Sequence, residues 1–582
     1  MASILIYLVI GLPWIGALLV WLAGDKRTAV QHMLAILFSV ASGIAAVALL
    51  FNTSNATVIN LDAGGVFGQF TFVADGLAVF LAVVATVIGS LAVIFSIDYM
   101  HGEKALGRYY AMVLFFIGGM AGLVLTSSLL LMFFFWEITA LCSYALISFH
   151  NDDPKAVAGG IKALIITQLG GVGLLAGALL LFSQTGSYDF NRLIADPDII
   201  DPRILSGMAF GFLAAAAAKS AQFPFQTWLP DAMEAPTPIS ALIHAATMVN
   251  AGVYLLARFF PAFKGVPGWT TAVILVGMIS AILTAIMALV ANDLKRVLAY
   301  STVSQLGYMV FAIGCGGVYA SQFHLFSHSI FKALLFLAAG AVIHSVGTRD
   351  MRQMGALGKQ MPLTRFVFVI GSLALAGIPV LNGFWSKELV LEAGLQHGPI
   401  WAYAFMLLSA GLTAFYTFRM VYMVFYGKPS SEKHVHDAQP AMKVALIPLA
   451  AGALFSWLLA GPFSNLLHNS LPAHEIHALT TTEVLMEVLA APATYIALAV
   501  VALGLIAWWQ RQHLGGIAHA FRWLTAAAEN SFGFEAVNAG IVRLTQGAAQ
   551  KLRTTQTGLL NWNIAGLLVA FIAVILILVV GG

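Results

Sequence analysis

The sequence has little charge and almost no cysteine. Only 9% of its 582 residues are Asp, Glu, Lys or Arg, whereas a soluble domain carries about 25% charged residues. A water-soluble fold could not bury an apolar fraction of 60%, so the composition favours a membrane protein. The two cysteines, Cys142 and Cys315, stand within apolar stretches, which argues against a disulfide framework and a Cys-ligated metal centre.

Several functional motifs are also missing. The chain has no CxxC cluster, no Rossmann fingerprint and no P-loop, so we expect no bound cofactor and no metal. The net charge of +3 is small for this length and does not indicate a nucleic-acid-binding protein. The first apolar stretch, from Ile4 to Leu22, lacks a charged start and a small-residue cleavage site, and we interpret it as a retained helix rather than a signal peptide.

What the sequence does contain is a series of apolar stretches, each about 20 residues long, the length needed to span a bilayer. They predict an all-α polytopic membrane protein with about sixteen transmembrane helices. We place these helices at residues 3–23, 30–51, 76–97, 109–126, 128–149, 160–182, 205–222, 238–260, 269–290, 297–316, 322–345, 364–394, 399–425, 442–468, 490–510 and 562–580.

Two of the predicted helices contain residues that break helices. Pro224 and Pro230 follow Lys219, and Pro379 and Gly383 precede Lys387. Proline removes a backbone donor and clashes with the preceding turn, and a break at membrane depth is tolerated only where protein or water covers the freed backbone. The repetition of a lysine beside a break predicts two inverted-repeat halves, as in many transporters.

The distribution of basic residues predicts the orientation. Lysine and arginine are concentrated in the loops after odd-numbered helices, and only Arg192, Arg203, Arg258 and Lys264 follow even-numbered ones. The positive-inside rule then places the odd loops in the cytoplasm and both termini on the outer, periplasmic side. We therefore expect a multi-pass protein of a bacterial inner membrane.

The segment before the last predicted helix differs from the rest. Over residues 535–553, Val537, Ile541 and Leu544 recur at helical spacing among polar residues, which indicates an amphipathic helix on the cytoplasmic surface; a solvated linker is the alternative. We divide the chain into N-terminal helices (1–108), a first half-channel (109–260), a second half-channel (261–428) and C-terminal helices with the amphipathic segment (429–582).

Ionisable residues inside predicted spans are candidates for function because a charge in the bilayer is costly unless it is paired or wetted. Glu137 and Lys219 lie on neighbouring helices and can form an ion pair. Desolvation and a nearby carboxylate change the proton affinity of a lysine in opposite directions, so making and breaking the pair would move a proton. A static ion pair that holds the helices together is the alternative.

Three residues on one predicted helix form a stripe. His324, His328 and Lys332 are four residues apart, so they share a face over about 12 Å, and His244 lies on another helix. Histidine titrates near neutral pH and can pass a proton between its two nitrogens. A hydrated proton relay, a metal site and ordinary packing histidines all fit this pattern, although the metal site lacks an evident third ligand.

Lys387 and Glu388 follow the second break directly. Their position beside a helix break is typical of transport sites. Alternatively, both side chains could lie near a helix end and extend to the membrane surface.

Long runs of the sequence resemble the antiporter-like subunits of respiratory complex I, the L subunit in particular, and the A subunit of Mrp-type sodium/proton antiporters. The resemblance spans about residues 70–428 and continues more loosely to the end of the chain. It is carried by Phe135-Trp136-Glu137, the run from Cys142 to Ile147, the run from Lys219 to Met233, the run from Ala235 to Val249, the run from Asp293 to Thr302 and the run from Phe331 to Phe336.

The resemblance implies functional roles for the same charged residues. It implies that Glu137, Lys219 and His244 form the first part of a proton path, which His324, His328, Lys332, Lys387 and Glu388 continue. Gly170-Gly171 departs from the Gly-Asp usual in complex I L subunits, and Asn250 stands where many relatives carry lysine.

Three functions therefore remain open. The chain could be a proton-translocating subunit energised by an associated complex, such as an NADH:quinone oxidoreductase-like translocase. It could be an ion-exchange subunit of an Mrp-type antiporter, or the proton-conducting partner of an inorganic carbon uptake system. Each function implies other membrane or peripheral subunits as partners, the lipid bilayer as the environment, and protons, with or without Na⁺, as the transported ions.

Overall fold

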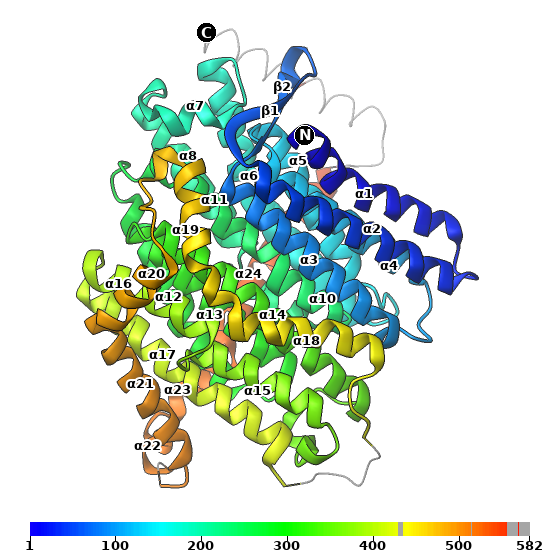
Figure 1. The fold of residues 1–582 in the computed structure, drawn as a ribbon, viewed down its shortest axis with the longest axis vertical. Helices are drawn as coiled ribbons and strands as arrows, with labels where there is room; N and C mark the ends of the chain where they lie inside the picture. The colour runs from blue at the N-terminus through cyan, green and yellow to red at the C-terminus, as the bar shows by residue number, and fades with distance from the viewer. Residues whose placement is uncertain (429–434, 514, 556–568, 570–582) are drawn as a thin grey trace. The chain divides into compact units, whose positions relative to one another are not determined.

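The computed structural model describes residues 1–428, 435–513, 515–555 and 569 (Figure 1). Helices dominate these residues, and thirteen helical segments within them are long and apolar enough to cross a membrane. The prediction of an all-α polytopic membrane protein is confirmed. The predicted count of about sixteen transmembrane helices is not confirmed, and the inverted-repeat relation between two halves stays a prediction.

The described residues up to Ala520 form one compact unit, and those from Phe521 onward form a second. The first part of the larger unit contains α1 (Ala2–Ala23), α2 (Thr28–Leu49), β1 (Ser54–Asp62), β2 (Gln69–Ala74), α3 (Gly76–Tyr99), α4 (Leu106–Leu125), α5 (Leu129–Ile147), α6 (Pro154–Thr185), α7 (Phe190–Ala195), α8 (Pro202–Lys219), α9 (Trp228–Asp231), α10 (Thr237–Ala241) and α11 (Met248–Phe263). Its second part contains α12 (Trp269–Val290), α13 (Leu294–Gly314), α14 (Val318–Val346), α15 (Pro362–Ala376), α16 (Asn382–His397), α17 (Ile400–Val421), α18 (Pro440–Phe455), α19 (Ala460–Ser470), α20 (Thr481–Ala490), α21 (Pro492–Trp509) and α22 (Gly515–Ala520).

Local capping residues set where several of these helices begin and end. Asp75 caps α3, Ser128 caps α5 and Asp293 caps α13, each by accepting a hydrogen bond from a backbone N–H of the first turn. Such acceptors satisfy donors that the helix itself leaves unpaired. Gly186 and Gly347 end α6 and α14 in the left-handed conformation that glycine adopts without strain.

Every predicted span up to residue 510 coincides with a helix or with a pair of broken helices. The predicted 562–580 helix lies outside the described residues. Both predicted breaks are confirmed, since α8 ends at Lys219, and α15 ends at Ala376 with five residues between it and the start of α16. The predicted 238–260 helix is instead α10, a π-helical turn at Leu242–Ala246, and α11.

A β-hairpin, which the sequence did not predict, connects α2 to α3. Its strands β1 and β2 pair antiparallel, and isolated bridges join Phe72 to Thr126 and Ser128 to Asp189. The first bridge connects the hairpin to the turn between α4 and α5, and the second connects that turn to the start of α7. Figure 1 shows the hairpin and α7 at one end of the unit. The last four residues of β2 are all buried, without the alternation that marks a strand, and β2 is followed almost directly by the apolar α3.

The second unit contains α23 (Arg522–Glu529) and α24 (Phe534–Thr555). The predicted 535–553 helix is therefore confirmed as a helix. Val537, Ile541 and Leu544 on its apolar face are exposed, as a membrane-surface helix requires. Its place on the cytoplasmic surface stays a prediction, as do the four domain boundaries drawn from the sequence.

One arginine assigned to a loop by the sequence pattern lies inside a helix. Arg258 belongs to α11 and is buried, so it does not belong in the count of loop charges. Its guanidinium donates two hydrogen bonds to the Asp75 carboxylate, of 2.5 and 2.8 Å, and a third of 3.2 Å to the Tyr254 hydroxyl. Since Asp75 also caps α3, this pair ties α11 to the start of α3 through one carboxylate.

Replacing Arg258 by Ala should destabilise the protein strongly. The change leaves the Asp75 carboxylate buried without its cation, which costs about 3–5 kcal/mol when one partner of a buried pair is removed. Thermal unfolding of the detergent-solubilised protein measures this effect as a lower midpoint. Lys264→Ala is the matched control, because Lys264 pairs with Glu475 at the surface and such pairs contribute about 0–1 kcal/mol. Equal shifts for both variants would contradict the interpretation.

Candidate functional site

The first broken helix places a lysine in the interior. Lys219 is the last residue of α8 and its side chain is fully buried. Its ammonium donates a hydrogen bond of 2.7 Å to the carbonyl oxygen of Trp136 and lies 4.9 Å from the centre of the Trp136 ring. The predicted ion pair with Glu137 is not formed within 4.0 Å in the described residues; the lysine binds the backbone and ring of the preceding residue instead.

The backbone of this break is satisfied by side chains from neighbouring segments. Ala221 has a φ of 51°, which turns the chain sharply after α8. The Trp228 indole donates to the carbonyl of Ala218 at 2.9 Å, and the Ser280 hydroxyl accepts from the Phe223 N–H at 2.9 Å. These bonds pair groups that an uninterrupted helix would have paired internally, which is the condition for a break at membrane depth.

Glu137 lies between this lysine and the side of the bundle. Its carboxylate lines a groove of about 570 Å³ between α5 and α6. Leu169 and Val172, on the α6 wall of the groove, are mostly exposed. Glu137 therefore has Lys219 on its inner side and a laterally open groove on its outer side.

Two adjacent glycines on α6 allow this arrangement. A Cβ at Gly171 would lie 2.6 Å from Glu137 Oε1, and a Cβ at Gly170 would lie 2.4 Å from the Cβ of Ala218. Gly170 thus permits α6 to pack closely on α8 beside Lys219, whereas Gly171 leaves space for the carboxylate. Gly171, which stands where complex I L subunits usually have Asp, therefore lies directly beside the Glu137 carboxylate.

His244 lies in the π-helical turn between α10 and α11. The turn ends at Thr247, whose backbone has φ −130° and ψ −107°. π-Helical turns inside α-helices are frequent at functional sites. The imidazole of His244 is fully buried 4.6 Å from the Phe336 ring, and neither ring nitrogen has a hydrogen-bond partner among the described residues.

The stripe on α14 divides into two different environments. His324 contacts the Gln305 side-chain oxygen through Nε2 and the Ser386 hydroxyl through Nδ1, both at 3.0 Å. Its two nitrogens are therefore held by α13 and α16, respectively. These two contacts fit a histidine with a packing role. The contact with Ser386 also connects the stripe to α16, because Ser386 directly precedes Lys387.

The lower part of the stripe is less satisfied. The His328 ring lies 6.4 Å from the His324 ring, near the spacing expected for adjacent turns, and its nitrogens have no partner in the described part of the chain. Lys332 donates to the Ser301 hydroxyl and, at 3.2 Å, to the Leu298 carbonyl. Buried imidazole nitrogens normally have a hydrogen-bond partner, so the environment of His328 differs from that of His324.

The second break holds Lys387 and Glu388 in the interior. They are only 1% and 2% exposed, so neither side chain reaches the surface as the snorkelling interpretation requires. The Lys387 ammonium lies 5.2 Å from the centre of the Tyr308 ring. A Cβ on Gly377, at the end of α15, would contact the Lys387 Cδ at 3.4 Å, so this lysine packs against the negative end of a helix dipole.

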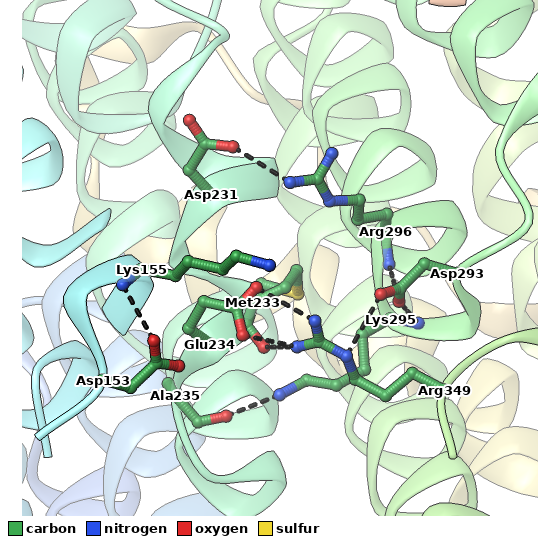
Figure 2. Close-up of polar contacts among 10 residues, drawn as sticks. All are labelled: Asp153, Lys155, Asp231, Met233, Glu234, Ala235, Asp293, Lys295, Arg296 and Arg349. Carbon is green, nitrogen blue, oxygen red and sulfur yellow. Dashed lines mark hydrogen bonds and ion pairs between the residues drawn. The ribbon is translucent and has the colours of Figure 1, made fainter. Parts of the chain in front are cut away.

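A network of charges that the sequence analysis did not single out covers one end of the first break (Figure 2). Arg349 binds both oxygens of Glu234 at 3.0 Å and Asp293 at 3.1 Å. Lys295, which is buried, donates to the Ala235 carbonyl at 2.5 Å. Burial alone would lower the pKa of the Arg349 guanidinium, but its bonds to Glu234 and the charge of Asp293 raise it. Arg349 therefore stays protonated, and its bonds tie the α9–α10 segment to α13 and α14.

The structure brings the eight predicted site residues into one unit and adds partners that sequence spacing could not identify. Gln305 and Ser301 come from α13 and Ser386 from α16. Gln305 and Ser301 stand in an uncharged stretch of sequence, so no local signal marked them. In the described residues no three His, Cys, Asp or Glu side chains are arranged to hold a metal ion.

Comparisons with known families and proteins agree on one relationship. Residues 126–413 match the family model described as NADH:quinone oxidoreductase/Mrp antiporter, TM, and residues 61–110 match the N-terminus of NADH-ubiquinone oxidoreductase (complex I) chain 5. The chain is 42% identical over 413 residues to NAD(P)H-quinone oxidoreductase chain 5 of Synechocystis sp., which covers 68% of this chain and 59% of that protein. It is 41% identical over 417 residues to the F(420)H(2) dehydrogenase subunit L of Methanosarcina mazei, which covers 65% of this chain and 62% of that protein.

Two solved structures share the fold. A chain of the Mrp complex from Dietzia sp. has a TM-score of 0.85 and 28% identity, covering 100% of this chain and 63% of its own length. A chain of an archaeal membrane-bound sulfane sulfur reductase has a TM-score of 0.73 and 26% identity, covering 84% of this chain and 99% of its own length. The chain spans less than two thirds of the length of the curated relatives described above.

Replacing Gly171 by Ala should slow ion movement without unfolding the protein. The added methyl group would displace the Glu137 carboxylate, the flexible end of a side chain, rather than backbone. We expect proton flux in vesicles to fall roughly tenfold, corresponding to about 1.4 kcal/mol of lost interaction.

Gly207→Ala on α8 is the control for this substitution, because a Cβ there would meet no atom within 4 Å. Unchanged flux in Gly171→Ala, at equal protein content, would show that the position of Glu137 does not matter for transport.

Proposed function

The chain belongs to the antiporter-like membrane subunit family of NADH:quinone oxidoreductases and Mrp antiporters, and from this membership we propose that it translocates protons through the larger unit. One observation carries the proposal. Lys219 and Lys387 are each buried at the break of a helix, and the histidine stripe of α14 lies in the segment between them. Ionisable residues inside a membrane protein are functional by default because their burial is costly.

The proposed path has a first part at α5, α8 and α11. Glu137 exchanges protons with Lys219, whose ammonium is bound by a carbonyl and an aromatic ring rather than by the carboxylate. A proton can leave such a lysine without breaking a tight ion pair. His244 follows, in the π-helical turn, with both ring nitrogens available.

The second part follows α14 to α16. His244 lies close enough to Lys332 and His328 for their charges to interact. From His328 the path continues to His324 and, through the Ser386 hydroxyl, towards Lys387. A step of about 6 Å between successive turns is too long for a direct hydrogen bond but suits one bridging water.

The proposal includes partner subunits that supply the energy. The described relatives are named as parts of quinone oxidoreductase, dehydrogenase and Mrp assemblies, and this chain contains no redox motif of its own. We propose that it works within such a complex in a bacterial inner membrane, with both termini on the periplasmic side. The charge network around Arg349 then lies on the cytoplasmic side, because the loops that carry it follow odd-numbered predicted helices.

A second candidate is a subunit of an Mrp-type cation/proton antiporter. The observation that favours it is the likeness to the Dietzia Mrp complex, which covers the whole chain at a TM-score of 0.85. The two candidates share the same proton path and differ in what drives it. Identification of the subunits that copurify with the native protein distinguishes them.

Replacing Lys219 by Ala should abolish proton movement and leave membrane insertion intact. Alanine removes the buried ammonium at the first break and suits the apolar surroundings better than lysine does. Flux is measured in vesicles with a pH-sensitive dye and normalised to the amount of protein. Lys264→Ala is the control lysine, because it lies at the surface. Parental flux in Lys219→Ala would refute the proposed function.

Replacing Glu137 by Gln should reduce flux more than replacing it by Asp. Gln keeps the shape and the hydrogen-bonding capacity of Glu but cannot carry its charge, which tunes the proton affinity of a neighbouring lysine. The same vesicle assay compares the two variants. Equal transport by both would mean that Glu137 has a structural role only.

A further inference from the structure

A second cavity lies beyond the end of the proposed path. It has a volume of about 320 Å³ and is bounded by the turn between α13 and α14, the end of α16, and the segment from α19 to α20. We call it the acidic vestibule, after the three glutamates that line it, Glu392, Glu475 and Glu487. Gln396, His397, His474 and His477 are among its other polar lining residues. At about 30 Å³ of liquid volume per molecule, it holds on the order of ten waters.

One carboxylate of the vestibule is buried and incompletely paired. Glu392 is 9% exposed, its Oε1 accepts a hydrogen bond of 2.6 Å from Gln396, and its Oε2 has no partner among the described residues. A buried carboxylate oxygen requires a compensating donor, and the adjoining cavity provides room for water in that role.

Glu392 also connects the vestibule to the proposed path. It lies four residues after Glu388 on α16, which places the two carboxylates on one face about 6 Å apart along the helix. The charge of Glu392 acts on Glu388 on one side and on Glu487 of α20 on the other. The three glutamates therefore form a series from the buried Lys387 to the vestibule.

His474, which lines the vestibule, does not offset the negative charge of its glutamates at neutral pH. Burial, followed by the charge of Arg258, lowers the pKa of His474 to about 4. Its Nε2 lies 3.0 Å from the Ala257 carbonyl, and its Nδ1 has no partner in the described part of the chain. Because a histidine with a lowered pKa is neutral above that value, His474 adds no positive charge at neutral pH.

From these contacts we propose that the acidic vestibule is the water-filled mouth through which protons pass between Lys387–Glu388 and the outer aqueous phase, with Glu392 as the group that carries them. This inference rests on the proposed function. In the transfer, the Glu392 carboxylate accepts a proton from the Lys387–Glu388 pair and passes it to water, or the reverse.

Part of the mouth comes from outside the segment that matches the family model. His474, His477 and Glu487 follow residue 413, where that match ends. The three loops that border the vestibule all follow even-numbered predicted helices, so the positive-inside rule places them on the side opposite the charge network around Arg349.

Cysteine accessibility tests the vestibule independently of transport. Cys142 and Cys315 are first replaced by Ala, which suits buried thiols that pack as small apolar groups. Ala393→Cys then places a thiol in the vestibule wall, and Leu408→Cys on α17 places one on an exposed apolar face as the control. Right-side-out vesicles are treated with cationic and anionic methanethiosulfonates, and labelling is followed by mass.

The Ala393→Cys thiol should react from the outside, about tenfold faster with the cationic reagent, since acidic clefts concentrate cations. Adding Glu392→Gln should reduce that preference, and Leu408→Cys should stay unlabelled. No labelling of Ala393→Cys from outside, or equal rates with both reagents, would overturn the proposal. Since this readout needs no flux, it can fail while Lys219→Ala still abolishes transport, and the two ideas are separable.

Glu392→Gln in the otherwise unchanged chain provides a second test that does not depend on the cysteine-free background. It should slow flux roughly tenfold, the size of the local concentration effect of a carboxylate-lined cleft. Glu483→Gln is the matched control on α20, because Glu483 caps its own helix and does not line the vestibule. Parental flux in Glu392→Gln would overturn its role as the proton carrier.

Discussion

Holding a lysine ammonium away from water is the constraint on which the two broken helices depend. At both breaks the ammonium is met by neutral groups: the carbonyl and ring of Trp136 for Lys219, and the Tyr308 ring with the end of α15 for Lys387. Carbonyl dipoles and aromatic faces stabilise a cation without fixing it as a carboxylate would. Because each lysine is held by such partners, gaining or losing a proton does not require the separation of a tight ion pair.

The rest of the unit keeps these two breaks in position. Asp75 and Arg258 tie α3 to α11, and the Arg349 network ties the segment after the first break to α13 and α14. The carboxylates of these pairs, Asp75, Glu234 and Asp293, lie at or between helix ends, whereas Lys219 in the interior has no ion-pair partner within 4.0 Å among the described residues. This division separates interactions that stabilise the fold from groups whose charge can change.

Much of the candidate site could be predicted because its residues are unusual where they stand. A lysine followed by prolines, or histidines repeated every fourth residue in an apolar helix, is visible in the sequence itself. Gln305 and Glu392 were not predicted, since a glutamine or a glutamate near a helix end has no local distinction. Their importance depends on contacts with His324 and with the vestibule, which are made by segments far apart in the chain.

The sequence by itself determined the membrane environment, the helical class, the two breaks and the two lysines beside them, because hydropathy and backbone restrictions act over a few neighbouring residues. Only the tertiary structure decided which atoms those charges meet. It placed Lys219 on Trp136 rather than on Glu137, and it brought Glu487 into one cavity with Glu392. Side-chain partners depend on how helices rotate and pack against one another, and no short stretch of sequence encodes that rotation.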